Sequence, residues 1–267
     1  MTRHEKLNPQ SISNHLLRDG FIKTIEVVDS IESTNQFLRD AAKEGTRSIG
    51  ACLVAESQSA GKGRMGRAWH SVPGESLTFS FLCPNFFPEK PGWMTLGVAT
   101  ALSTAIERMA AVDTRIKWPN DLYMDHRKLA GILAQAVHAP TGPVMVIGVG
   151  LNVNAAPPIK PSRSEVSPVS LRELTGSRTD RSLLLAAIIN EVHKTFLLFE
   201  RGDTESVFLV FKQRSLLMGA RARFRWKKEI HEGTVIDHTR NLGIVLDMGD
   251  AVVELPGETA ELLSFQV

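Results

Sequence analysis

Residues 51–82 read ACLVAESQSAGKGRMGRAWHSVPGESLTFSFL, two apolar runs separated by a glycine-rich segment. The runs at residues 51–56 and 76–82 are short and bounded by turn-forming residues, which favours strands. Between them lie glycines and cationic side chains, ending in a Pro73-Gly74 turn. The stretch therefore predicts two strands of one sheet, joined by a loop whose backbone can approach a ligand closely.

The chain on either side of this stretch mixes helices with strands. A helix capped by Ser33 or Thr34 is stopped by Gly45. Residues 114–137 predict two strands joined by a polar turn, and the nearly all-apolar run 144–154 predicts a central strand. Further elements are expected as helices at residues 12–18, 94–109, 183–200 and 205–215 and as a strand at residues 21–28. The fold class is therefore α+β, with a mixed sheet and helices.

The last fifty residues change in character. Five short apolar runs follow one another from residue 219 onward, a pattern that suits a small closed β-barrel. We expect a short N-terminal segment at residues 1–24, a main domain at 25–216 and the small barrel at 217–267. Residues 155–170 are rich in proline and serine, which predicts a surface loop.

Composition excludes several classes of protein. The 267 residues are 43% hydrophobic and carry a net charge of only +2, too even a balance for a protein that binds nucleic acid phosphates. No apolar run approaches the roughly 20 residues of a membrane span. Cys52 and Cys83 lie in apolar runs and are expected to be free and buried. We expect a soluble, cytoplasmic protein. We also expect no resident metal, because the histidines lack the spacing of metal ligands.

The loop from Gly61 to Arg67 is the first candidate for chemistry. Its glycines and three cations suit a phosphate or carboxylate. The spacing GKGRMG also matches a dinucleotide fingerprint, but no helix or acidic residue follows where that motif needs them. A phosphate-binding P-loop is excluded as well, because Arg67 and Ala68 replace its lysine and hydroxyl residue. An ordinary solvated basic turn is the alternative.

The second candidate is the segment from Lys117 to Asp121, with Lys128 after the following turn. Both lysines could lie at one end of the sheet over a shared pocket, where Asn120 and Asp121 would hold a magnesium ion, a ribose or a phosphate-bound water. The alternative is a Pro-Asn-Asp turn with solvated lysines.

A third group consists of small neutral hydrogen-bonding residues. Ser33, Thr34 and Asn35, with Gln58, could bind a neutral polar ligand, although as isolated residues they fit a helix cap and a strand-end amide better. Asn152 is ambiguous in the same way.

Five segments follow one another along the chain: STN at 33–35, QSAGKGRMGRAW at 58–69, KWPNDLY at 117–123, KLAGIL at 128–133 and GVGLNVN at 148–154. In this order the chain strongly resembles the biotin-protein ligases, from about residue 25 to the C-terminus. The resemblance implies a catalytic domain related to lipoate ligases and an SH3-like C-terminal barrel. It also implies two steps: biotin and MgATP form biotinyl-5′-AMP, and biotin then passes to a lysine of a biotin carboxyl carrier protein domain.

The resemblance also assigns roles. Lys128 and Arg64 are the implied catalytic residues. The implied biotin site comprises Ser33, Thr34, Asn35, Gln58, Lys62, Gly63, Arg64 and Lys128. The implied ATP site comprises Arg67, Trp69, Lys117, Asn120, Asp121 and Asn152. Lys62 stands where the family usually has arginine, so the planar fork for bidentate contacts is lost.

Several alternatives stay open. A lipoate ligase or octanoyl transferase would share the fold, a non-catalytic biotin-binding module would keep the residues without turnover, and a peptide-binding module would rest on the barrel alone. Some family members add an N-terminal DNA-binding domain, and the short segment before residue 25 leads us to expect a form without one. The sequence leaves both a monomer and a homodimer open.

Overall fold

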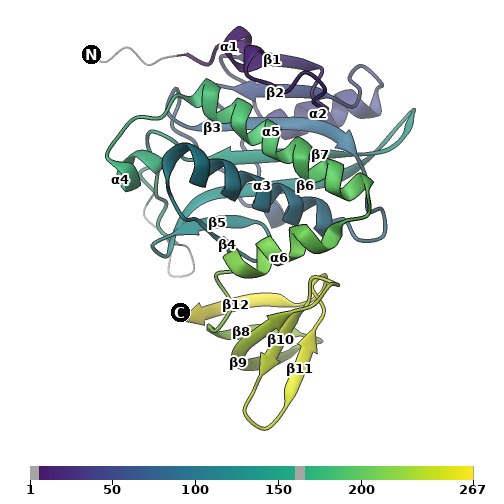
Figure 1. Cartoon of the computed structure of the whole chain (residues 1–267), viewed down its shortest axis with the longest axis vertical. Helices are drawn as coiled ribbons and strands as arrows, with labels where there is room; N and C mark the ends of the chain where they lie inside the picture. The colour runs from purple at the N-terminus through teal and green to yellow at the C-terminus, as the bar shows by residue number, and fades with distance from the viewer. Residues whose placement is uncertain (1–5, 160–165, 267) are drawn as a thin grey trace.

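The computed structural model describes residues 6–159 and 166–266, which form two sheets and six α-helices (Figure 1). Of the predicted loop at 155–170, residues 160–165 lie outside the described residues.

A seven-stranded mixed sheet forms the larger part of the molecule. Its strands are β1 (Thr24–Val28), β2 (Ala51–Ala55), β3 (Leu77–Pro84), β4 (Arg115–Lys117), β5 (Asp121–Met124), β6 (Arg127–Ala139) and β7 (Gly142–Leu151). Their spatial order is β1-β2-β3-β7-β6-β5-β4, with β1 and β2 parallel and the other pairs antiparallel. β7 is the middle strand and is buried from Val144 to Leu151, which confirms the prediction of a central strand.

Helices cover both faces of this sheet. α3 (Gly92–Ala110) and α5 (Arg181–Glu200) lie side by side across one face, and α6 (Thr204–Arg214) packs against them (Figure 1). α2 (Thr34–Lys43) packs on β2, β3, β6 and β7, where Leu38 and Ala42 form a second apolar cluster. The short helices α1 (Pro9–Asn14) and α4 (Leu171–Thr175) complete the set.

α5 corrects one expectation from the sequence. It is the one helix in the described parts of the chain that is long and apolar enough to cross a membrane, with a mean hydropathy of 1.4. Leu184, Ile188 and Phe196 on this helix are nevertheless buried in the core. A Cβ atom at Gly97 of α3 would lie 2.5 Å from Cζ of Phe199, so the two helices pack at close range. These contacts are those of a core helix.

The strand prediction for residues 114–137 was incomplete. The structure has three strands there, because Trp118-Pro119-Asn120 interrupts the first run and the Trp118–Pro119 peptide bond is cis. α1 begins and ends earlier than predicted, at Pro9 and Asn14. α4 was not predicted, although Ser170 and Glu173 form a capping box at its start. Short helices of this kind carry too little apolar periodicity to be recognised.

The second sheet contains the five strands predicted for the C-terminal region. They are β8 (Arg221–Trp226), β9 (Glu229–His238), β10 (Ile244–Asp247), β11 (Val252–Leu255) and β12 (Glu261–Gln266). The order β11-β10-β9-β8-β12 places β11 and β12 at opposite edges. The expected closure of the barrel was therefore wrong: the five strands form an antiparallel sheet with two edges.

The second sheet meets the larger part beneath α6 and β4 (Figure 1). The Trp118 indole N–H donates to the Leu242 carbonyl at 3.1 Å, and its ring lies edge-on to Phe224. Ser215 Oγ and His238 Nε2 are 2.7 Å apart in a buried contact. The joint therefore lies directly beside the segment from Lys117 to Asp121.

Cys52 and Cys83 are free and buried, as predicted. Burial raises the pKa of the Cys52 thiol to about 12, so this group is protonated and packs as a small apolar side chain.

Candidate functional site

One row of paired residues crosses the larger sheet and forms the floor of the candidate site. Thr78 pairs with Gly150, Gly150 with Gly131, Gly131 with Asp121, and Asp121 with Lys117. Directly paired residues on neighbouring strands face the same side of a sheet. Two glycines in the middle of the row therefore leave a stretch of sheet without side chains of its own, with Asp121 and Lys117 at one end.

Neighbouring side chains fill the space that these glycines leave. A Cβ atom at Gly150 would lie 2.2 Å from Cε2 of Trp69, so the indole rests directly on this residue. A Cβ at Gly148 would lie 2.7 Å from Nδ2 of Asn35. The glycines of GVG thus admit one side chain from the loop and one from α2, both on the face opposite α3 and α5.

The glycine-rich loop folds back on itself. Gly63 N–H donates to the Arg67 carbonyl at 2.7 Å, and Trp69 N–H donates to the Gly61 carbonyl at 2.8 Å. Met65 and Gly66 at its tip have φ angles of 56° and 74°, and the Met65 side chain is 76% exposed. The Gly63 amide is therefore engaged within the loop in this conformation.

A neutral polar cluster lies at the start of α2. Gln58 Oε1 accepts from Thr34 N at 2.8 Å and from Thr34 Oγ1 at 3.1 Å, and Thr34 Oγ1 lies 2.8 Å from Ser80 Oγ. Ser33 caps the helix by accepting from Gln36 N, as the alternative interpretation predicted. Asn35 donates to the Leu133 carbonyl, while its buried Oδ1 has no partner among the described residues.

Ser80 is the member of this cluster that sequence reasoning missed. It is fully buried in β3, within the apolar run TFSFL. A lone hydroxyl that shares the face of Thr78 in an otherwise apolar strand was the available signal, because alternate residues of a strand face the same side.

A charged network continues from the cluster across the sheet. Lys128 Nζ lies 2.8 Å from Asp121 Oδ2 and 5.8 Å from the centre of the Trp69 ring. Asn120 donates to Asp121 Oδ1 and accepts from Arg64 Nη1 at 3.1 Å. Burial lowers the pKa of Arg64, an effect that Asp121 opposes. The loop and the segment around Asp121, far apart in sequence, are thus joined here.

Lys117 lies at the far end of the floor. Its ammonium donates to the Tyr123 hydroxyl at 3.3 Å and lies 5.2 Å from the centre of that ring. Burial lowers the pKa of Lys117; Asp121 opposes this effect, and Lys128 and Arg67 add to it. Burial also raises the pKa of Tyr123. Several cations thus surround one carboxylate, an arrangement that suits an anionic ligand.

Two candidate residues have structural contacts that the sequence did not suggest. Asn152 is 1% exposed, and its Nδ2 donates to the carbonyls of Lys128 and Val169, while its Oδ1 has no partner in the described part of the chain. Lys62 donates to Gln36 Oε1 at 2.9 Å on the surface of α2. Asn152 therefore fixes the backbone of Lys128, and Lys62 ties the loop to the helix.

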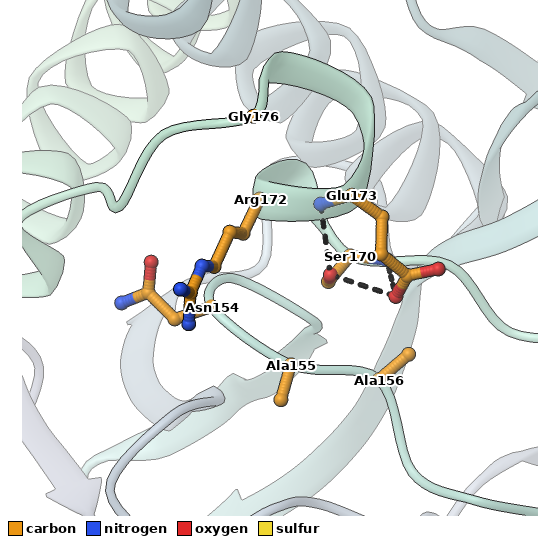
Figure 2. A pocket seen from close by; sticks show the side chains of 7 residues that line it. All are labelled: Asn154, Ala155, Ala156, Ser170, Arg172, Glu173 and Gly176. Carbon is orange, nitrogen blue, oxygen red and sulfur yellow. Dashed lines mark hydrogen bonds between the residues drawn. The ribbon is translucent and has the colours of Figure 1, made fainter. Parts of the chain in front are cut away.

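Two hollows of the described surface, each with a volume of about 440 Å³, lie away from these residues. Figure 2 shows the one beside α4, whose lining includes Asn154 and Arg172, and where Ser170 and Glu173 bind each other. The other lies at the start of α5 and is lined by Arg178 and neighbouring residues. At the candidate site itself, the indole of Trp69 rests directly on Gly150.

Comparisons with known proteins agree with this geometry. Residues 27–152 match the biotin/lipoate A/B protein ligase family. The chain is 31% identical to a biotin–[acetyl-CoA-carboxylase] ligase of Mycobacterium tuberculosis, over 84% of each chain. It is 36% identical to the bifunctional ligase/repressor BirA of Escherichia coli, over 73% of this chain and 59% of that relative.

The fold also matches a solved structure. A biotin protein ligase from Aquifex aeolicus, in complex with biotin and ATP, superposes with a TM-score of 0.79 at 24% identity, over 90% of this chain and 99% of that one. The matched fold and the relative aligned over most of both chains lead to one conclusion: the chain belongs to the biotin protein ligase family.

Proposed function

We propose that this chain is an ATP-dependent biotin–protein ligase. It activates biotin with MgATP to biotinyl-5′-AMP and transfers the acyl group to one lysine of a biotin carboxyl carrier protein domain. The observation that carries the proposal is the floor of the site. A neutral polar cluster at Thr34 and a cationic cluster at Lys128 lie on one face of the sheet, on either side of the glycine positions that Trp69 covers.

The neutral end suits the ureido ring of biotin. Recognising a ureido group requires paired donors and acceptors without net charge, and a site built to pair them strongly rejects ligands that lack them. Thr34 and Gln58 supply such groups, and the buried Asn35 Oδ1 is an acceptor without a partner among the described residues. Ser33 completes this end, and Lys62, Gly63 and Arg64 are proposed to close over the ring.

Lys128 is proposed to act where the two substrates meet. The biotin carboxylate must approach an anionic α-phosphate, and a cation held between them reduces their repulsion and stabilises the charge of the transition state. Lys128 Nζ now pairs with Asp121 at 2.8 Å, so we expect ligand binding to exchange this partner. The attacking group is already a carboxylate, so the first step needs no general base.

The cationic end suits the nucleotide. Trp69 offers an apolar ring for the adenine, and Arg67 and Lys117 are proposed to hold the phosphates. Asn120, Asp121 and Asn152 supply oxygen atoms, the ligand type that Mg²⁺ prefers. The buried Asn152 Oδ1 without a partner among the described residues fits this assignment. MgATP enters as a substrate complex.

The acceptor and the setting of the reaction are part of the proposal. The acceptor is a biotin carboxyl carrier protein of a carboxylase, in a cytoplasmic location. We propose a short N-terminal segment at residues 1–24, a catalytic domain at 25–216 and a small C-terminal domain at 217–267. We propose neither a nucleic acid partner nor a membrane partner. A monomer and a homodimer both suit the site, which lies within one chain.

A competition experiment tests the proposal. The purified protein is mixed with MgATP and equal amounts of biotin, lipoate and octanoate, and the products are read by mass spectrometry. We expect biotinyl-AMP, with pyrophosphate released only when biotin is present. A lipoyl or octanoyl adenylate would assign a different acyl substrate, and the absence of any adenylate would favour a binding module without turnover. The relatives named above are biotin ligases, which disfavours the lipoate alternative.

A further inference from the structure

Lys117 touches the C-terminal sheet as well as its own. Its Nζ lies 5.5 Å from the centre of the Phe265 ring on β12 and 5.2 Å from that of Tyr123 on β5. Tyr123 is 3% exposed, and Phe265 is half-buried. Two aromatic rings, one from each sheet, therefore lie next to one ammonium group.

The position of Phe265 is fixed by the sheet that carries it. Phe265 pairs with Ala222 across β12 and β8, and Ala222 is 1% exposed, so Phe265 shares the core-facing side of that sheet. The next residue after Lys117 is held by the connection between β9 and β10 of this sheet, because the Trp118 indole N–H donates to the Leu242 carbonyl at 3.1 Å. The C-terminal sheet thus contacts two consecutive residues at the edge of the site.

The contacts with Tyr123 and Phe265 suit a lysine that must keep its positive charge where water is excluded. An aromatic face attracts an ammonium group electrostatically, and the attraction is stronger where water is excluded. Tyr123 adds one hydrogen bond at 3.3 Å. Lys117 is left with donors for a ligand, and Asp121 lies opposite it in the sheet.

We propose that Phe265 is a positioning residue for the nucleotide: together with Tyr123 it holds the Lys117 ammonium over the cationic end of the site, where the triphosphate of ATP binds. This proposal rests on the proposed function, because it places the phosphates at Lys117. It assigns to the C-terminal sheet a specific task in the first step of the reaction.

The first test compares Phe265→Leu, which keeps apolar bulk but removes the aromatic face, with Phe265→Tyr, which retains it. In biotin-dependent exchange of pyrophosphate into ATP, we expect Phe265→Leu to raise KM for ATP by about 3- to 10-fold. KM for biotin should stay at the wild-type value. Phe265→Tyr should restore KM for ATP. Leu263→Ala, an exposed side chain on the same strand, is the matched control and should leave both constants unchanged.

The second test does not depend on turnover. Lysines of the free protein are acetylated competitively over a range of pH, and the peptides are quantified by mass spectrometry. We expect the pH-independent rate constant for Lys117 to rise several-fold in Phe265→Leu, with no change in Phe265→Tyr or at Lys43, an exposed lysine on α2.

The outcomes separate the two claims. Wild-type protein without biotin-dependent exchange would refute the proposed function, while the labelling would still decide whether Phe265 shields Lys117. The positioning role is overturned if Phe265→Leu leaves KM for ATP and the labelling rate at wild-type values. It is also overturned if Phe265→Leu shifts the biotin and ATP constants equally, or if Phe265→Tyr fails to restore them.

Discussion

The indole ring of Trp69 occupies the space that a side chain at residue 150 would need: a Cβ atom on Gly150 would lie 2.2 Å from Cε2 and 2.4 Å from Nε1 of the ring. The buried Nε1 has no hydrogen-bond partner among the described residues. The glycine therefore allows the indole to lie directly on the sheet, with its Nε1 against residue 150.

Gly150→Ala is expected to displace Trp69 and weaken nucleotide binding. The added methyl group overlaps the ring, and overpacking of this kind costs about 1–3 kcal/mol. KM for ATP in the exchange reaction should rise more than KM for biotin. The control is Val149→Ala, which alters the buried opposite face of the same strand. This control should lower the free energy of unfolding while leaving KM for ATP unchanged; if it raises KM equally, the effect comes from the strand and not from Trp69.

Lys128→Gln is expected to reduce the rate of adenylate formation by about 10²–10³-fold, the effect of removing one preorganised group that stabilises transition-state charge. Single-turnover formation of biotinyl-AMP measures this step directly. Lys43→Gln, on the exposed surface of α2, controls for the loss of one positive charge. A Lys128→Gln variant that forms adenylate at the wild-type rate would remove Lys128 from the catalytic role.

The sequence predicted the central strand and the helix starting at Ser33 because their signals are local. β7 is an uninterrupted apolar run, and Ser33 is a helix-capping hydroxyl ahead of an apolar periodicity. The break at Trp118-Pro119-Asn120 and the open edges of the C-terminal sheet were missed. The break had a local signal, because Pro119 and Asn120 are turn-forming residues and Lys117 pairs with Asp121 directly across the turn. The open edges depend on pairing between strands that are distant in sequence, which no local pattern encodes.

In the candidate site, too, the sequence identifies residues with a local motif and misses contacts that form only in the fold. The motifs identified Lys128 and Asp121, but not that they form an ion pair at 2.8 Å. Ser80 and Phe265 belong to no sequence motif. Ser80 meets Thr34 because of its position in β3, and Phe265 meets Lys117 because the two sheets are in contact. The use of Asn152 Nδ2 to hold the Lys128 carbonyl is likewise visible only in three dimensions.

A buried ion pair supports the start of the glycine-rich loop. Arg181 Nη1 lies 2.7 Å from Glu56 Oε2, the side chains are 3% and 10% exposed, and Glu56 also accepts from Leu7 N. Glu56→Gln is expected to lower the free energy of unfolding by about 3–5 kcal/mol, because it removes the negative charge from a buried, hydrogen-bonded ion pair. Urea denaturation measures the change.

The exposed pair of Arg47 and Glu26, with side chains 42% and 49% exposed, is the matched control for this prediction. Glu26→Gln should cost less than about 1 kcal/mol, because solvent screens the pair. Equal effects of Glu26→Gln and Glu56→Gln would show that burial does not distinguish the two pairs.

Stability is expected to fall in mild acid because of His238. Burial lowers its pKa from 6.5 to about 4, with Asp237 opposing the shift and Lys212 adding to it. The unfolded chain therefore binds a proton that the folded chain does not. The stabilisation, up to about 3 kcal/mol, is present above pH 6.5 and is lost as the pH falls toward 4.

Urea denaturation between pH 4 and pH 7.5 measures this contribution. His238→Gln, whose amide can still bond Ser215, should flatten the pH dependence, whereas His15→Gln, at an exposed position beyond α1, should not. An unchanged slope in His238→Gln would assign the acid sensitivity to other groups.

Arg64 is expected to retain the adenylate. The intermediate is a mixed anhydride that water hydrolyses, so the loop must cover it until the carrier arrives. Arg64 Nη1 donates to Asn120 Oδ1 at 3.1 Å, across a sequence separation of 56 residues. This bond joins the loop to the floor of the site. Arg64→Ala should therefore release biotinyl-AMP into solution, measured as loss of label from protein retained on a filter.

Asn120→Ala removes the same bond from the other side and provides the internal check. If the bond to Asn120 is what holds Arg64 over the intermediate, both single variants should leak adenylate, and the double variant should leak no faster than Arg64→Ala, because residues that act through one contact are not additive. Arg127→Ala, which breaks an exposed pair with Glu173, should retain the label. Additive leakage would instead mean that Arg64 holds the adenylate directly, while unchanged retention in Arg64→Ala would exclude the role altogether.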